Sequence, residues 1–300
     1  MPLTGMNARK HWLFYTLLAV LAWGVWGAFS DLPTKAGFPE TLVYVVWALT
    51  MIPPAFVSLH RGGGKLHRDR RSIALGAAAG LLGAGGQLVL FKVLTIAPAY
   101  LVFPLIALSP VVTIIMALAI SRERASRRGW LGIILALLAS VLISYSTAGD
   151  SMVKGYLWVL LSLLILIAWG VQAFVISHAN KTMSAESVFF YMMLSGLALI
   201  PVALAMTDFS KPIEWGPKGP WLAAGIQILN ACGALILVYA FRYGRAIIVA
   251  PLVNAAPPVL TMVLSLLIFQ RMPHLVNAIG IAIAVLATVL MALEEERRES

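Results

Sequence analysis

Charged residues are scarce in this chain. They make up 11% of its 300 residues, whereas a soluble domain carries about 25%. Hydrophobic residues account for 61%, and the mean hydropathy is +0.91. So much apolar surface cannot be buried in one water-soluble core of this size, so a lipid bilayer must act as a second solvent.

Cysteine and the motifs of common enzymes are also missing or nearly so. The single cysteine, Cys232, cannot form an internal disulfide, and its apolar surroundings favour a packing role. The chain has no Walker loop, no His/Cys spacing typical of a metal site and no Gly-x-Ser-x-Gly segment. We therefore expect no ATP-driven pump, no enzyme, no catalytic residue, and neither a metal nor another cofactor.

Acidic residues are nearly absent from the apolar segments. Glu186 is the only carboxylate within them, and it follows Ser184 at a position that suits a helix N-terminus. A carboxylate proton relay, or a site for organic cations with a buried glutamate, would lack its main group. His178 is left as a residue for proton coupling, or alternatively as a loop-boundary residue.

What the chain does contain is a series of long apolar stretches. A spanning helix needs about 20 mostly apolar residues, because each residue rises about 1.5 Å through a core about 30 Å thick. The stretches that qualify, spans 1 to 10, are 12–29, 41–59, 72–97, 99–120, 130–147, 155–178, 185–206, 221–241, 246–269 and 275–293. The sequence thus predicts an all-α integral membrane protein with ten transmembrane helices.

The basic residues fall mainly on one side of these spans. Of the 22 lysines and arginines, sixteen lie in the two tails and in the loops after spans 2, 4, 6 and 8. Five lie in the loops after the odd-numbered spans, and Lys92 lies within a span. Because cytoplasmic loops collect Lys and Arg, both termini are predicted to be cytoplasmic. The net charge of +10 is then a consequence of topology, and no nucleic-acid partner is expected. The expected location is a multi-pass position in a bacterial inner (plasma) membrane, with a eukaryotic equivalent left open.

Short patterns recur along the chain at a nearly constant offset of 146 to 148 residues. The matching pairs are Ala22-Trp23-Gly24-Val25 with Ala168-Trp169-Gly170-Val171, Pro104 and Ser109-Pro110 with Pro251 and Ala256-Pro257, and Gly132 and Ala136 with Gly280 and Ala284. We therefore expect two repeats, over 11–147 and 155–293. Each contains five spans, so the second enters the membrane from the opposite side. Such inverted repeats are typical of alternating-access transporters with a midplane site.

These patterns resemble the drug/metabolite transporter superfamily and, within it, proteins with two EamA domains. The resemblance covers nearly the whole chain and rests on the Trp-Gly segments, on Ala97-Pro98-Ala99-Tyr100, on Pro110 and Pro257, and on Glu123 before the helix at 132–144. It implies a central cavity lined mainly by spans 1, 3, 4, 6, 8 and 9, in a family with many metabolite exporters. The second half carries Gln270-Arg271 where the first has Glu123-Arg124, so the acidic member of that motif is not duplicated.

Polar and aromatic groups on those spans are the candidates for substrate binding, since polar side chains inside a bilayer are costly unless paired or facing a cavity. The amides suit a neutral polar or zwitterionic solute, or else hydrogen-bond between helices. The tryptophans either stack on substrate or serve packing. The predicted substrate-binding residues are Trp23, Gln87, Lys92, Ser109, Trp169, Gln172, Gln227, Asn230 and Asn254.

The predicted function is secondary transport of a small neutral or zwitterionic metabolite, such as an amino acid or a sugar, by an exporter, exchanger or facilitator. An alternative is an organic-anion or sugar-phosphate exchanger that uses Lys92, whose side chain either faces the cavity or reaches the headgroups. A lipid-handling membrane scaffold is a further alternative. The expected partners are a small-molecule substrate and membrane lipid, and the oligomeric state is left open between monomer and homodimer.

Overall fold

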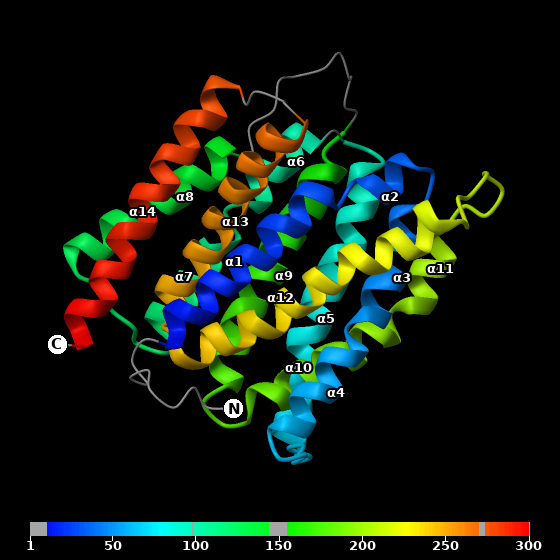
Figure 1. The fold of residues 1–300 in the computed structure, drawn as a ribbon. Helices are drawn as coiled ribbons and strands as arrows, with labels where there is room; N and C mark the ends of the chain where they lie inside the picture. The colour runs from blue at the N-terminus through cyan, green and yellow to red at the C-terminus, as the bar shows by residue number, and fades with distance from the viewer. Residues whose placement is uncertain (1–10, 98, 144–154, 270–273, 300) are drawn as a thin grey trace.

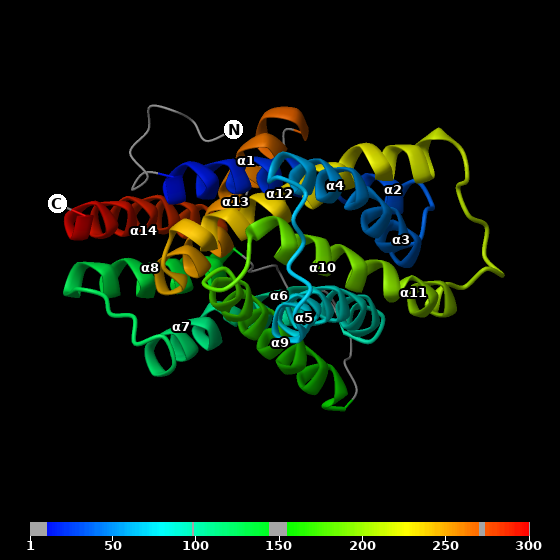
Figure 2. The same cartoon turned by 90° about the horizontal axis from the view of Figure 1, so that it is seen from below.

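Every regular element of the computed structural model is a helix within the residues that it describes, which are 11–97, 99–143, 155–269 and 274–299 (Figure 1). The helices pack side by side in one bundle (Figure 2). In chain order they are α1 (His11–Phe29), α2 (Leu32–Lys35), α3 (Glu40–Thr50), α4 (Ile52–Arg61), α5 (Arg70–Leu94), α6 (Ala99–Ile106), α7 (Ser109–Ala119), α8 (Arg127–Ile143), α9 (Leu157–Ala179), α10 (Ala185–Ala198), α11 (Ile200–Met206), the π-helical turn η2 (Pro217–Trp221), α12 (Leu222–Tyr243), α13 (Ala246–Phe269) and α14 (Leu275–Glu299).

Eight of the ten predicted spans are long and apolar enough to cross a membrane within the described ranges. The other two are spans 4 and 5. Span 4 is divided into α6 and the short apolar α7. Span 5 corresponds to α8, which has 17 residues up to Ile143, and its predicted end at 147 lies outside the described residues. Large apolar side chains point away from the bundle, among them Leu21 at 53% exposure and Ile134 at 58%, as expected where lipid replaces water as the solvent.

Proline accounts for the breaks inside predicted spans. Spans 2, 4 and 7 each consist of two helices, and the second helix carries proline in its first turn. The residues concerned are Pro53, Pro110 and Pro201. A proline ring removes one backbone donor and clashes with the preceding turn, so a helix tends to restart there. The spans therefore bend where their prolines lie.

The packing of α8 against α14 shows the internal symmetry directly. A side chain added at Gly132 would collide with Met291, and one added at Gly280 would collide with Ile143. Adding 148 to 132 and to 143 gives 280 and 291, so the two close contacts are copies of each other. The matching glycines predicted from sequence are thus places where the two halves approach closely.

The directions of α1 and α12 follow from their shared contacts. Tyr15, early in α1, stacks on Tyr239, late in α12, with ring centroids 5.1 Å apart. Farther along α1, Trp26 donates a hydrogen bond to Gln227, early in α12, over 3.2 Å. The two helices therefore run antiparallel, and α12 ends where α1 begins.

The equivalent helices α1 and α9 run in opposite directions. α9 ends at Ala179, and α10 begins a few residues later at Ala185. Glu186 in the first turn of α10 accepts a hydrogen bond of 2.5 Å from the hydroxyl of Tyr239. Hence α9 ends at the end of the bundle where α1 begins, and the five-helix halves are inverted copies.

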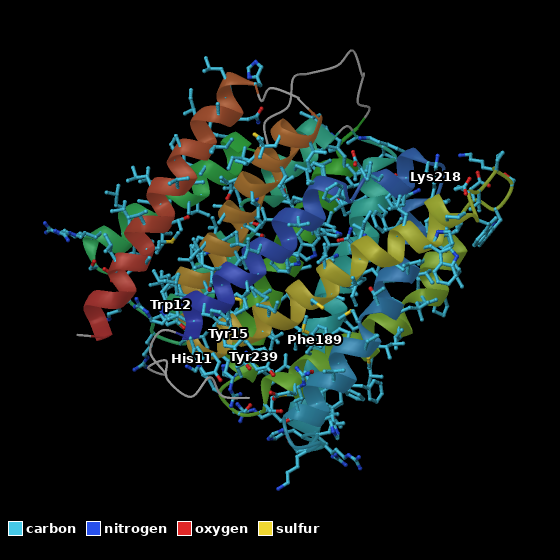
Figure 3. All side chains as sticks on the ribbon, in the orientation of Figure 1. His11, Trp12, Tyr15, Phe189, Lys218 and Tyr239 are labelled. Atoms are coloured by element: carbon cyan, nitrogen blue, oxygen red, sulfur yellow. The ribbon has the colours of Figure 1, made fainter. Side chains whose placement is uncertain are left out.

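The two ends of the bundle differ in charge. The end where α1 begins carries a concentration of cationic side chains and is called the basic end; it includes Arg61, Arg71, Lys181, Arg242 and Arg245. The other end carries Asp31, Glu40 and Asp208 together with two lysines, Lys35 and Lys211, that pair with two of these acids, and for its carboxylates it is called the acidic end. Figure 3 places His11, Tyr15 and Tyr239 near the first and Lys218 at the second.

Candidate functional site: a central cavity between the repeats

A cavity of about 480 Å³ lies between the two halves. Its walls come from α1, α3, α5, α7, α9, α10, α12 and α13. This volume lies within the usual range for small-molecule sites, about 300–1,000 Å³. The cavity therefore has the size of a metabolite site, and it occupies the interface that the repeats predict.

Eight of the nine residues predicted for substrate binding line this cavity or the chamber that adjoins it. The chamber, also of about 480 Å³, shares Gln87, Trp169, Asn230 and Asn254 with the cavity and extends to Asp31 and Glu40 at the acidic end. The eight are Trp23, Gln87, Ser109, Trp169, Gln172, Gln227, Asn230 and Asn254.

Lys92 is the exception among the predicted residues. Lys92 is exposed in the last turn of α5 and lines neither the cavity nor the chamber. α5 presents Gln87 to the cavity, and five residues further the helix has turned by about 500°, or about 140° beyond one full turn, so Lys92 points elsewhere. The anion-exchanger alternative required this ammonium in the cavity.

The wall formed by α1 and α12 is a chain of hydrogen bonds. Trp26 donates to the side-chain oxygen of Gln227 over 3.2 Å, and the amide nitrogen of Asn230 donates to the same oxygen over 3.2 Å. Asn230 in turn accepts from Trp23 over 3.0 Å. We call these four side chains the paired wall, because its indoles and amides bind one another.

The wall formed by α5 and α9 is built differently. Trp169 donates to the backbone oxygen of Gly83 over 3.2 Å. Gln172 lies against Gly83, and Gln87 faces both the cavity and the chamber. Neither glutamine makes a hydrogen bond with any other residue that the structure describes. We call Gln87 and Gln172 the open wall, because their amides are available to a ligand.

The two walls are symmetry mates. Trp169 contacts Gly83 and Gly86, whereas Trp23 contacts Asn230 and Gly233. Positions 83 and 86 plus 147 give 230 and 233, and Trp23 plus 146 gives Trp169. The same packing is therefore used twice, with glycine at one position and asparagine at its counterpart.

A second symmetric pair of hydrogen bonds joins the halves. Thr113 donates to the backbone oxygen of Gly170 over 2.8 Å, and Thr261 donates to that of Gly24 over 2.9 Å. Both threonines also line the cavity. Interhelical bonds of this kind contribute about 0.6 kcal/mol each on average. They tie α7 to α9 and α13 to α1.

Asn254 lies where the two repeats meet. Its amide nitrogen donates to the backbone oxygen of Ala107 over 2.7 Å and approaches the Ser140 hydroxyl at 3.3 Å. Subtracting 147 from 254 gives 107, so Asn254 binds its own counterpart in the other half. This contact lies on the pseudo-two-fold axis and leaves the amide oxygen for a ligand, since no described residue donates to it.

Trp47 is a site residue that the sequence analysis missed. Its indole nitrogen is buried without a hydrogen-bond partner among the described residues, and the side chain borders both the cavity and the chamber. Span 2 is not among the spans that the resemblance assigns to the cavity. A tryptophan in the middle of span 2 was the available signal, and its lack of a partner among the described residues became visible only in the structure.

The electrostatics of the site are simple. Among the described residues that line the central cavity there is no Asp, Glu, Lys or Arg. Acids appear only at the mouth of the chamber, where Asp31 is paired with Lys35. His178 lies outside the cavity, with its ring nitrogen 3.4 Å from the Arg71 guanidinium. The site can therefore bind by hydrogen bonds and ring contacts without a fixed counter-charge.

Hydrogen bonds join the two halves at the basic end. The Glu123 carboxylate accepts from the backbone nitrogen of Ile247 over 3.0 Å, at the start of α13. The Arg245 guanidinium donates to the backbone oxygen of Arg124 over 2.5 Å, and Lys181 donates to the Ser121 hydroxyl over 3.1 Å. Gln270, the predicted counterpart of Glu123, lies outside the described residues.

The comparison with known families agrees with this architecture. The model of the EamA-like transporter family matches residues 10–145 and again residues 154–293. The chain belongs to the EamA-like transporter family. It is thus a multi-pass membrane transporter of the drug/metabolite transporter superfamily, whose partners are small-molecule substrates and lipids.

Two further similarities accompany the EamA match. An uncharacterized protein of Methanocaldococcus jannaschii is 25% identical over 135 residues, which cover 45% of this chain and 96% of the relative. A relative of that length corresponds to about one repeat of the present chain. A protein of known crystal structure aligns with a TM-score of 0.75 and 20% identity, over 96% of this chain and 98% of the other. This second similarity shows a shared fold.

Proposed function

We propose that this EamA-family transporter carries a small neutral or zwitterionic metabolite, with amino acids favoured over sugars. The observation that carries the proposal is the open wall. Gln87 and Gln172 offer amide donors and acceptors to a cavity whose described lining holds no ionised side chain. An amide can serve both the ammonium and the carboxylate of a zwitterion, or the hydroxyls of a sugar.

The indoles around the cavity add to this preference. Trp23, Trp26 and Trp169 line the cavity. The indole nitrogen of Trp47, which has no partner among the described residues, is a donor that a substrate oxygen would satisfy. A ring face can contact an apolar side chain or an ammonium group. Together these groups suit a solute with one apolar part and a few polar atoms.

Alternating access is the proposed mechanism. The inverted halves, the paired threonine bonds and the contact of Asn254 with its own counterpart support rocking of one half against the other around a fixed site. The chamber leads from the cavity toward the acidic end, whereas Glu123 and Arg245 bridge the halves at the basic end. With the basic end in the cytoplasm, as the charge bias favours, this conformation is open to the outside.

The test is counterflow of radiolabelled solutes in proteoliposomes. Amino acids, sugars and phosphorylated metabolites are compared for the wild type, for Gln87→Leu and for Lys92→Met. Both substitutions lie in α5 and remove the polar group of one side chain, but only Gln87 faces the cavity. We expect amino-acid flux that falls about fivefold or more in Gln87→Leu, as for the loss of one hydrogen bond of about 1 kcal/mol.

Lys92→Met is expected to transport like the wild type. Preferred flux of phosphorylated metabolites, abolished in Lys92→Met, would overturn the proposal in favour of the anion exchanger. Sugar flux without amino-acid flux would retain the neutral cavity and reverse the preferred substrate class.

A further inference from the structure

A second hollow lies on the outside of the bundle, near the basic end. Its volume is about 590 Å³, and it is bordered by α1, α4 and α12 and by the start of α10. In Figures 1 and 2, α12 lies between α1 and α4. The hollow is therefore a groove whose floor is α12 and whose walls are α1 and α4. None of its lining residues belongs to the central cavity or its chamber.

The groove is long, and its character changes along its length. On the floor, Ile228, Cys232, Leu235, Tyr239 and Tyr243 follow one face of α12. These fifteen residue steps correspond to about 22 Å. The half away from the basic end is apolar, whereas the half toward it carries hydroxyls. A hydrocarbon leaflet is about 15 Å thick, so the groove matches one leaflet together with its headgroup zone.

The polar end of the groove holds two opposite charges that do not pair. Arg61, at the end of α4, and Glu186, at the start of α10, both border it. No ion pair joins them, and Arg61 makes no hydrogen bond with any residue that the structure describes. Glu186 receives the Tyr239 hydroxyl on one oxygen, and no described residue donates to the other.

A cluster of aromatic rings lies next to the carboxylate, which one of them, Tyr239, contacts through its hydroxyl. Tyr15 stacks on Tyr239 and on Tyr243, with centroids 5.1 and 5.5 Å apart, and His11 meets Tyr243 edge to face at 5.3 Å. Figure 3 shows His11, Tyr15 and Tyr239 gathered at this end. A carboxylate favours an ammonium group, and a guanidinium favours a phosphate.

We propose that this groove is a binding site for a phospholipid with an ethanolamine headgroup. Its phosphate pairs with Arg61, its ammonium lies between Glu186 and the tyrosine rings, and one acyl chain lies along α12. A primary ammonium donates hydrogen bonds to the carboxylate, which a quaternary ammonium cannot do. The glycerol of phosphatidylglycerol carries no positive charge, so it cannot balance the Glu186 carboxylate. The site does not depend on which solute the central cavity transports.

The alternative is a purely structural role, in which Glu186 only stabilises the start of α10. Acidic residues suit the first turn of a helix, and Ser184 already caps α10 through a 3.2 Å bond from the Ser187 nitrogen. That role predicts a loss of thermal stability in Glu186→Gln with no change in lipid preference. The two interpretations therefore differ in a measurable way.

The first experiment measures lipid binding by native mass spectrometry of the detergent-solubilised protein. Dioleoyl-phosphatidylethanolamine is compared with the phosphatidylcholine and phosphatidylglycerol of the same chains. We expect ethanolamine lipid to bind about fivefold or more tightly than the other two. Glu186→Gln is expected to abolish that preference. Arg61→Gln is expected to weaken all three lipids.

Lys218→Gln is the matched control, because it removes one exposed cation at the acidic end, far from the groove (Figure 3). It is expected to bind all three lipids as the wild type does. Equal binding of the three lipids, a preference retained in Glu186→Gln, or a preference for phosphatidylglycerol would each overturn the proposal. So would equal occupancy of the site by soluble phosphoethanolamine at the same concentration.

The second experiment locates the lipid. Cys232 is the only cysteine of the chain and lies on the floor of the groove, partly exposed. Its alkylation by N-ethylmaleimide in nanodiscs is expected to be about fivefold slower with phosphatidylethanolamine than with phosphatidylcholine. Equal rates would place the bound lipid elsewhere and overturn the assignment, even if a variant at Glu186 fails to fold.

Discussion

The paired wall and the open wall occupy equivalent places in the two repeats, yet they present opposite chemistry. On α1 and α12, Trp26, Gln227 and Asn230 bind one another. On α5 and α9, glycines stand at the positions equivalent to Gln227 and Asn230, and glutamine stands at the position equivalent to Trp26. The backbone arrangement is duplicated, but the polar groups are not.

The difference shows how a symmetric scaffold can hold an asymmetric ligand. Amides that bind indoles within the paired wall hold the helices and the rings in position. Amides of the open wall have no partner among the described residues, so a substrate gains their full hydrogen-bonding capacity. We infer that the paired wall supports the site and the open wall recognises the solute.

The largest expected effect comes from filling the open wall. A side chain added at Gly83 would meet the amide nitrogen of Gln172 at 2.1 Å. Because that group is the end of a flexible side chain, Gly83→Val should fold but displace Gln172 into the cavity. We expect transport in proteoliposomes to fall more than about tenfold.

The matched control for Gly83→Val is Gly85→Ala in the same helix, where an added Cβ meets nothing within 4 Å. This variant should transport like the wild type. Full activity of Gly83→Val would show that Gln172 has no part in recognition and would remove the distinction between the walls.

A smaller effect separates affinity from stability. Gln172→Leu removes an amide that has no partner among the described residues, so we expect a KM about five- to tenfold higher with an unchanged melting temperature. Gln227 is 3% exposed and accepts from both Trp26 and Asn230. Gln227→Leu should therefore lower the free energy of unfolding by about 1 kcal/mol.

Transport kinetics and thermal unfolding of the two variants check this contrast between the walls. If both variants changed KM and melting temperature alike, the two walls would be equivalent in function, and the division of roles inferred above would be wrong.

The smallest expected effect concerns helix starts outside the membrane. Asp69 caps α5 by accepting from the Ser72 nitrogen over 3.0 Å, and hydrogen bonds from Ser72 lower the pKa of this exposed carboxyl from its ordinary value of 3.8. A lowered pKa means that the carboxylate stabilises the folded state above about pH 4 and that this contribution is lost as the pH falls further. The neutral cap of α10, Ser184, has no such dependence.

Asp69→Asn keeps a good cap without a titrating group. Between pH 6 and pH 3, its melting temperature should fall slightly less than that of the wild type. If the melting temperatures of Asp69→Asn and the wild type fell by the same amount across this pH range, the charge of Asp69 would not contribute to stability.

Most of the architecture could be predicted from the sequence. Hydropathy is a property of short segments, so the spans were found with errors only where proline divides them, as at Pro110, or where the helix is short, as for α8. The repeats were visible because Trp23 and Trp169, and Gly132 and Gly280, retain their identities after duplication. The family match agrees with this prediction.

The site was predicted less completely. The span that carries a polar residue is evident from sequence, but its direction around the helix axis is not, since successive residues turn by about 100°. That is why the sequence left the Lys92 side chain open between the cavity and the headgroups. Trp47 was overlooked for another reason, since its span was not assigned to the cavity. Which amides form hydrogen bonds within the protein is harder still to predict, because nothing in the local sequence around Gln87 or Gln227 distinguishes an available amide from a bonded one.

The sequence by itself determined the solvent, the class and the symmetry of this protein. Apolar length requires a membrane, and an odd number of spans in each repeat requires inversion. Only the tertiary structure decided which amides bind indoles, which face the cavity, and that Arg61 and Glu186 share one end of a groove without pairing. The physical reason is that hydropathy is summed along a helix, whereas hydrogen bonds depend on distances of about 3 Å between helices far apart in the chain.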